Sequence, residues 1–122
     1  MNDQTSPPAL VIEDDFGLIT IFAKALEMAG FEVKAITDGG EALQYLKTTT
    51  PEVIVLDLHL PTLSGIEIFN YFHTKTRFSK TRVIIATADL AAANTLGQDV
   101  DLVLVKPISF NQLRDLAMRL RQ

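Results

Sequence analysis

The sequence of 122 residues predicts an α/β fold, in which a doubly wound sheet of five parallel strands carries five helices in one domain. Two observations predict it. Five short runs rich in Val, Ile and Leu occur along the chain, and each precedes a segment whose apolar residues recur at helical spacing. The runs are almost continuously apolar, as expected for strands that helices cover on both faces. With right-handed crossovers, all five strands should end at the same edge of the sheet.

The first strand is expected at residues 9–12, directly before the acidic residues Glu13, Asp14 and Asp15. A helix should follow, because apolar residues recur there every three or four positions. These residues are Leu18, Ile19, Phe22, Leu26 and Ala29. Gly30 then occupies the position where a helix commonly ends in a left-handed residue.

The second strand is expected at residues 31–37, and Asp38 can cap a short helix that runs to Leu46. Pro51 ends the connection. The third strand, residues 53–56, is a Val/Ile/Leu run that should lie in the middle of the sheet.

A third helix is predicted by the spacing of Ile66, Ile68, Phe69 and Phe72. It should end in the polar stretch 73–81, and the fourth strand should occupy residues 82–86. Residues 90–96 are only weakly helical, because they are rich in Ala and poor in large apolar residues, and Gly97 ends them. This helix should therefore be the least stable of the five.

The fifth strand is expected at residues 102–105, before Lys106 and Pro107. The last helix should begin at Ser109, an N-cap residue with Gln112 three positions further on. Its buried face should comprise Leu113, Leu116, Ala117 and Leu120.

Composition narrows the class of protein. The chain is 48% hydrophobic and 21% charged, which fits a globular domain from residue 9 onward behind a short polar tail of residues 1–8. No apolar run approaches the roughly 20 residues of a membrane span. The first residues, MNDQTSPPA, lack the basic and apolar regions of a signal peptide, so we expect a cytoplasmic protein.

Charge and cysteine content exclude further classes. The chain has no Cys, so it has neither disulfides nor thiol chemistry. Its formal charge is −4 and its Lys and Arg residues form no cluster, which argues against nucleic acid as a direct partner.

Polar residues suited to cation and phosphate chemistry follow four of the five predicted strands. They are Glu13, Asp14, Asp57, Thr87 and Lys106. Each has a simpler explanation when taken alone: a helix cap for the acidic pair, a turn for Asp57, a backbone hydrogen bond for Thr87 and an ordinary solvated lysine. A parallel sheet would bring all of them to one edge, where open α/β sheets bind their ligands.

Of carboxylates gathered at one edge, one would take up a proton unless a cation joined them. At separations of about 4–5 Å they repel each other by roughly 1–4 kcal/mol per pair. A few oxygen ligands suit Mg²⁺, which keeps several of its waters. With Lys and Thr available for phosphoryl oxygens, Asp57 is then placed to act as the nucleophile in phosphoryl transfer.

The arrangement resembles the receiver domains of two-component response regulators, the CheY-like variant of the flavodoxin-like (βα)5 fold. Four motifs carry the resemblance over almost the whole chain: Glu13-Asp14 after LVI, Asp57 before LHLPTLSG, Thr87-Ala88 after VIIA, and Lys106-Pro107 after VLV. Their order and spacing are far more specific than any one of them.

The resemblance implies a magnesium site and a phosphoryl acceptor. Asp14 and Asp57 would ligate Mg²⁺ directly, Glu13 would act mainly through water, and the backbone carbonyl of His59 would complete the protein ligands. Asp57 would accept the phosphoryl group from a phosphohistidine on a histidine kinase or phosphotransfer protein.

The resemblance also implies how the phosphoryl group is held and used. Thr87 would bond to it and Lys106 would neutralise it, with a cis peptide before Pro107. The domain would then act as a switch that gains and loses its own phosphoryl group, without turnover of a small molecule as its main role. Signalling would proceed through altered binding of an output protein that the sequence does not identify.

Two departures from the family pattern lie near the end of the chain. Receiver domains often carry Tyr or Phe three residues before the Lys, where this chain has Val103. The stretch 87–106 is also about one helical turn shorter than is usual. We therefore do not carry over the family's usual dimer and expect a monomer or a weak dimer.

His59 lies two residues after the predicted nucleophile. One interpretation is an ordinary solvent-facing loop residue. The other is that its imidazole lies over the mouth of the site and affects the access of water to the acyl phosphate.

Three alternatives to the phosphorylated switch can be compared. A docking module with the same fold that is never phosphorylated would not need all five site residues. Phosphatases with an aspartyl nucleophile usually have a second Asp two residues after it, where this chain has His59. A flavin-binding protein would need a hydroxyl- and glycine-rich phosphate loop after the first strand, where this chain has acids.

Overall fold

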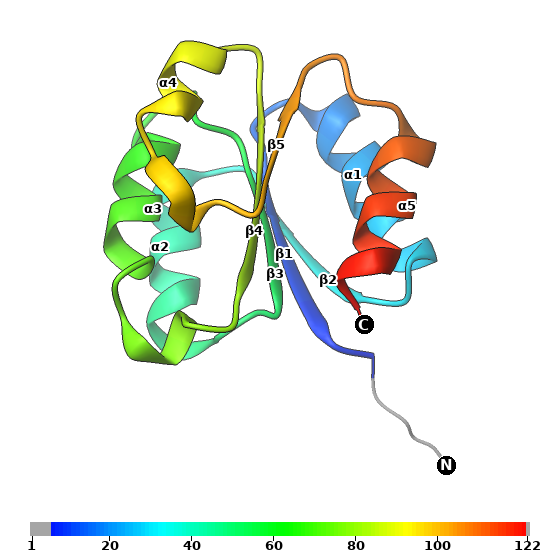
Figure 1. The fold of residues 1–122 in the computed structure, drawn as a ribbon, viewed down its shortest axis with the longest axis horizontal. Helices are drawn as coiled ribbons and strands as arrows, with labels where there is room; N and C mark the ends of the chain where they lie inside the picture. Colours follow the sequence, from blue (N-terminus) through cyan, green and yellow to red (C-terminus); the bar gives the residue numbers. More distant parts are fainter. Residues whose placement is uncertain (1–5, 122) are drawn as a thin grey trace.

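The computed structural model describes residues 6–121 and confirms the predicted fold (Figure 1). Five strands form one sheet in the order β2-β1-β3-β4-β5, and every neighbouring pair is parallel. Residues 1–5 of the expected polar tail lie outside the described residues. Among the described residues, no helix combines the length and the apolar character needed to cross a membrane.

The strands are β1 (Pro8–Ile12), β2 (Glu32–Ile36), β3 (Val53–Leu56), β4 (Arg82–Thr87) and β5 (Leu102–Val105). The helices are α1 (Phe16–Met28), α2 (Gly39–Thr48), α3 (Gly65–Phe72), α4 (Leu90–Asn94) and α5 (Phe110–Leu120). Two short 3₁₀ helices that the sequence did not predict, η1 (Thr76–Phe78) and η2 (Gly97–Asp99), lie on either side of β4 and α4. The weak helix predicted at 90–96 is thus present, but it has only five residues.

The sheet separates two hydrophobic cores. Helices α1 and α5 cover one face, and α2, α3 and α4 cover the other (Figure 1). Because side chains alternate along a strand, Val53 and Val55 enter the core on the side of α1 and α5. Ile54 and Leu56 enter the core on the side of α2, α3 and α4. All four side chains of β3 are buried, which explains why the strand reads as an uninterrupted apolar run.

All five α-helices begin with a side-chain N-cap that accepts the backbone N–H three residues further on. The caps are Asp15, Asp38, Ser64, Asp89 and Ser109. Ser64 forms a complete capping box with Glu67, a Ser-x-x-Glu pattern that our prediction overlooked. Because each helix follows a strand of a parallel sheet, these caps surround the edge that holds the predicted site residues.

Two glycines are required where they occur. Gly30 has φ of 102°, as predicted for the left-handed residue after α1. Gly65 begins α3, and a Cβ atom there would lie 2.1 Å from the Asp57 carbonyl oxygen and 2.7 Å from Leu58 Cα. Only glycine therefore lets the loop after β3 return this closely to the end of the strand.

Candidate functional site

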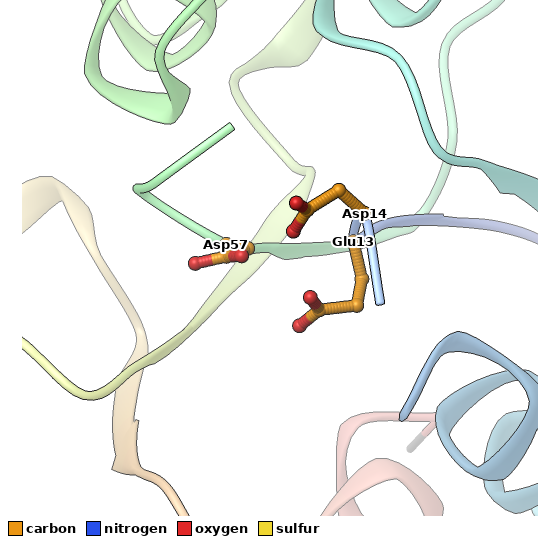
Figure 2. A group of neighbouring side chains, drawn as sticks. All are labelled: Glu13, Asp14 and Asp57. Atoms are coloured by element: carbon orange, nitrogen blue, oxygen red, sulfur yellow. The ribbon is translucent and has the colours of Figure 1, made fainter. Parts of the chain in front are cut away.

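Three carboxylates meet at the carboxyl edge of the sheet. Glu13 and Asp14 follow β1, and Asp57 follows the neighbouring β3; each offers an oxygen, and these oxygens all lie within 4.8 Å of one another (Figure 2). Glu13 and Asp57 are buried, whereas Asp14 is exposed. The strand ends are held by backbone bonds from Glu13 N–H to the Ile36 carbonyl (3.2 Å) and from Asp57 N–H to the Ile12 carbonyl (3.0 Å).

Lys106 supplies a positive charge to this cluster from β5's side of the sheet. Its Nζ lies 2.7 Å from Glu13 Oε1 and 3.5 Å from Asp57 Oδ2. Its backbone N–H donates to the Thr87 carbonyl (2.9 Å), and the peptide bond to Pro107 is cis. Two of the three carboxylates therefore lie next to one ammonium group.

The pKa values of Glu13 and Lys106 respond to this arrangement. Burial raises the pKa of Glu13 above 4.5, since the hydrogen bonds from Lys106 and the Asp15 N–H compensate for it only in part. Burial alone would lower the pKa of Lys106, but the hydrogen bond to Glu13 and the charges of Asp57 and Glu13 outweigh it, so the net shift is upward. The lysine stays charged, and a second cation would relieve the cost of ionising the buried Glu13 carboxyl.

The donor set fits Mg²⁺. All side-chain donors of the cluster are carboxylate oxygens, the ligands that Mg²⁺ prefers. Glu13 Oε1 is buried and lies 2.7 Å from Lys106 Nζ.

Thr87 ends β4 and is fully buried. Its Oγ1 accepts a hydrogen bond from the Asp89 N–H (3.0 Å). In the sheet, Leu56 pairs with Ile85, so Asp57 and Thr87 follow neighbouring strands at nearly the same level. The structure thus brings Thr87 to the same edge as the acidic cluster.

The His59 side chain extends away from the acidic cluster toward the loop after β4. Its backbone N–H donates to Asp57 Oδ1 (3.1 Å), and its Nε2 lies 3.0 Å from Asp89 Oδ2. The ring remains 67% exposed, so the pair spans the outside of the site. Ligation by the His59 carbonyl stays a prediction. The sequence analysis did not pair these residues, because they are 30 positions apart and no local pattern connects them.

Thr62 holds the same loop from its other side. Its hydroxyl donates to Asp38 Oδ1 (2.9 Å), and Gly39 packs so closely against Leu63 that a Cβ atom would lie 2.4 Å from the Leu63 carbonyl oxygen. The loop after β3 is therefore tied to the N-caps of two neighbouring helices, Asp38 of α2 and Asp89 of α4.

Both of these aspartates have a lowered pKa. For Asp38 the main cause is the hydrogen bond from the Glu41 N–H, followed by the one from Thr62. For Asp89 it is the hydrogen bond from the Ala92 N–H, followed by the one from His59. Each cap is a carboxylate stabilised in its ionised form by two different parts of the chain.

Val103 occupies the position where an aromatic residue was expected from the family pattern. It pairs with Ile85 in the sheet and packs, partly buried, against the core on the side of α2, α3 and α4. Strand β5 therefore presents an aliphatic side chain at this position to the core that also contains Ala92 and Ala93 of α4.

Comparison with known sequences identifies one family. The profile described as "Response regulator receiver domain" matches residues 9–118. The phosphate regulon transcriptional regulatory protein PhoB of Rhizobium meliloti is 32% identical over 110 residues, which is 88% of this chain and 48% of PhoB. The transcriptional regulatory protein PrrA of Mycobacterium leprae is 39% identical over 64 residues, 52% of this chain and 28% of PrrA. The chain thus spans about half or less of these curated relatives.

Solved structures show the same fold. The receiver domain of the Francisella response regulator 1452 is 30% identical with a TM-score of 0.79, covering 93% of this chain and 95% of its own. The chemotaxis response regulator CheY4 of Vibrio cholerae has a TM-score of 0.82 at 23% identity, covering 95% and 99% of the two chains.

Proposed function

This chain belongs to the response regulator receiver domain family, and from that premise we propose that Asp57 is its phosphoryl acceptor. The donor would be a phosphohistidine on a histidine kinase or phosphotransfer protein. One observation carries the proposal: Asp57 shares a cluster with Glu13 and Asp14, whose oxygens lie within 4.8 Å of one another, and Lys106 reaches into it. Gain and loss of the phosphoryl group would change the binding of an output protein.

The residues of the site support each part of the transfer. A carboxylate oxygen of Asp57 attacks phosphorus; the O–P bond forms as the P–N bond of the phosphohistidine breaks, and the electron pair leaves with the imidazole nitrogen. Lys106 Nζ, 3.5 Å from Asp57 Oδ2, lies where it can neutralise a phosphoryl oxygen. The Thr87 hydroxyl would donate a hydrogen bond to another phosphoryl oxygen. Water later cleaves the acyl phosphate and restores the carboxylate.

Mg²⁺ would be held directly by Asp14 and Asp57, through water by Glu13, and by the His59 carbonyl. When bound, it neutralises charge on the phosphoryl oxygens. The three carboxylates supply oxygen donors only, and two of them are buried, which favours a firmly held, partly hydrated hard cation.

The remaining assignments are proposals of the same kind. We assign residues 9–122 to the receiver domain, expect it in the cytoplasm as a monomer or weak dimer, and expect no direct contact with nucleic acid. The kinase or phosphotransfer protein would supply a phosphohistidine, and the output protein would distinguish the two states of Asp57.

Beryllofluoride tests the proposal against a docking module that is never phosphorylated. It mimics a phosphoryl group on a carboxylate, so with Mg²⁺ it should shift the backbone amide signals of the strand ends around Asp57 and Thr87. NMR is the suitable method because the chain has no Trp. The Asp57→Asn variant keeps the shape of the side chain and should show no such shifts. An unchanged wild-type spectrum would favour the docking module.

Added Mg²⁺ should stabilise the fold in a pH-dependent way. Since the folded pKa of Glu13 is raised above 4.5, its favourable contribution to stability is complete below 4.5 and is lost as rising pH ionises the buried carboxylate. Mg²⁺ should relieve that cost at neutral pH. At ten times its Kd we expect about 1.4 kcal/mol of added stability, shrinking as the pH falls toward 4.5.

Thermal unfolding with and without Mg²⁺ measures this effect. Asp14→Asn should lose most of the stabilisation, whereas Asp115→Asn, on the exposed surface of α5, should keep it. A metal site at this cluster would be contradicted if Mg²⁺ stabilised the wild type equally at neutral pH and near pH 4.5. It would also be contradicted if Mg²⁺ stabilised Asp14→Asn as much as the wild type.

A further inference from the structure

We infer that Asp89 is a positioning residue for Thr87: it holds the threonine hydroxyl so that its proton points to a phosphoryl group on Asp57. The inference rests on the proposed function. It assigns a role in phosphoryl transfer to a residue that is not a member of the acidic cluster of Glu13, Asp14 and Asp57.

The contact between Asp89 and Thr87 determines how the hydroxyl is used. The Asp89 N–H donates to Thr87 Oγ1 over 3.0 Å. A hydroxyl has one proton and two lone pairs, and this bond occupies a lone pair. Thr87 is fully buried, so solvent does not compete for the hydroxyl. The bond therefore leaves the proton of Thr87 to be donated, which is what a phosphoryl oxygen requires.

The side chain of Asp89 fixes the position of its own N–H. Oδ1 accepts the Ala92 N–H in the first turn of α4 (2.9 Å), and Oδ2 lies 3.0 Å from His59 Nε2. The residue is thus tied to α4 on one side and to the loop after β3 on the other. Because its backbone cannot shift without breaking one of these contacts, they also restrain the bond to Thr87.

These contacts form a path from the phosphoryl acceptor to Thr87. The His59 N–H donates to Asp57 Oδ1 (3.1 Å), the His59 ring meets Asp89, and Asp89 bonds to Thr87. Asp57 and Thr87 end neighbouring strands, so the path spans the gap between β3 and β4. Asp89 is the member that joins the two loops.

The chain offers a matched control at Asp38. Like Asp89, it caps a helix, accepts the N–H three residues on (2.8 Å), and bonds to a side chain of the loop after β3, here Thr62. The hydrogen bonds of its side chain do not include Thr87. Asp38→Ala therefore loses the same kinds of contact as Asp89→Ala, and only the latter affects the threonine.

The test measures the rate at which acetyl phosphate labels the protein in the presence of Mg²⁺. Asp89→Ala should slow labelling by about threefold to tenfold, the effect of one lost hydrogen bond on a barrier. Removing a negative charge near the anionic acetyl phosphate would by itself speed labelling. Slower labelling of Asp89→Ala therefore cannot come from the change in charge. Asp89→Asn keeps the cap and a partner for His59 and should label at least as fast as the wild type.

Two further comparisons separate positioning from general destabilisation. Asp38→Ala should label within about twofold of the wild type, and Mg²⁺ affinity should be unchanged in both alanine variants. In a Thr87→Val background, Asp89→Ala should cause no further slowing, because the hydroxyl through which it acts is gone. Asp89→Ser retains a capping oxygen, but its side chain is too short to reach His59, so this variant should also slow labelling. It replaces Asp89→Ala in the test if the alanine variant unfolds.

The outcomes distinguish this inference from the proposed function. Absence of label on the wild-type protein overturns both. If the wild type is labelled, three results would overturn the inference alone. Asp89→Ala could be labelled as fast as or faster than the wild type, or Asp38→Ala could be slowed equally. The third result is that Asp89→Ala slows the Thr87→Val protein as much as it slows the wild type.

Discussion

Replacing Asp57 with alanine is expected to reduce labelling by acetyl phosphate and Mg²⁺ to background. The change removes the proposed nucleophile, and the two other carboxylates of the cluster are not equivalent to it. Glu13 is already engaged by Lys106 at 2.7 Å, and Asp14 is exposed. Radiolabel retained on the acid-treated, denatured protein measures the effect.

The loss of label should not come from unfolding. Asp57 is one of three clustered carboxylates that repel one another by roughly 1–4 kcal/mol per pair, so its removal relieves repulsion. Lys106 keeps Glu13 as its closer partner. We therefore expect Asp57→Ala to unfold at a temperature no lower than that of the wild type in the absence of Mg²⁺.

Asp15→Ala is the matched control for this experiment. Asp15 lies at the same edge of the sheet and caps α1 through the Leu18 N–H (2.9 Å), but it is not a member of the acidic cluster. The variant should remain labelled. Label that survives Asp57→Ala would overturn the assignment of the acceptor.

Replacing Gly65 with alanine is expected to cause the largest loss of stability among these changes. The added Cβ would lie 2.1 Å from the Asp57 carbonyl oxygen and 2.7 Å from Leu58 Cα, well inside contact distance. Both obstacles are backbone atoms, so no rotamer change relieves the clash. We expect a loss of about 1–3 kcal/mol in the free energy of unfolding.

The same substitution should impair the site. To relieve the clash, the start of α3 must move away from the end of β3, and the Gly65 N–H must then loosen its bond to the Leu58 carbonyl (3.0 Å). Asp57 and His59 flank Leu58, so weaker beryllofluoride binding should accompany the lower stability. Urea denaturation and the NMR titration measure the two effects separately.

Gly40→Ala provides the comparison. It also lies in the first turn of a helix, but its Cβ would meet only Asp38 Oδ2, the end of a flexible side chain, at 3.2 Å. Its unfolding free energy should stay within about 1 kcal/mol of the wild type. If the two variants proved equally stable, the close approach of Gly65 to the strand would not constrain the fold.

The order of elements could be predicted because it depends on local chemistry. Strands β3 and β5 begin and end where the apolar runs do: all four residues of β3 are buried, and β5 consists of Leu and Val throughout. The helix starts at Asp38 and Ser109 follow from capping by the side chain of one residue. Each of these features is decided within a few residues of sequence.

Helix lengths and short turns depend on distant contacts. Helix α2 continues to Thr48, past the predicted end, and Arg77 donates to the Leu46 carbonyl and to Thr50 Oγ1 (2.7 Å) from 27 or more positions away. That arginine belongs to η1, which was not predicted. Orphan carbonyls at a helix end can be satisfied by any side chain that the fold brings near.

The five strands, the edge at which they end and the polar residues at that edge could be predicted without the structure. These residues are Glu13, Asp14, Asp57, Thr87 and Lys106. Their proximity follows from the parallel topology, which the alternation of strands and helices dictates. The pairing of these groups depends on the three-dimensional fold. Lys106 lies closer to Glu13 than to Asp57, and His59 meets Asp89. Such pairings depend on the distance and direction of side chains on separate loops, which no spacing along the chain encodes.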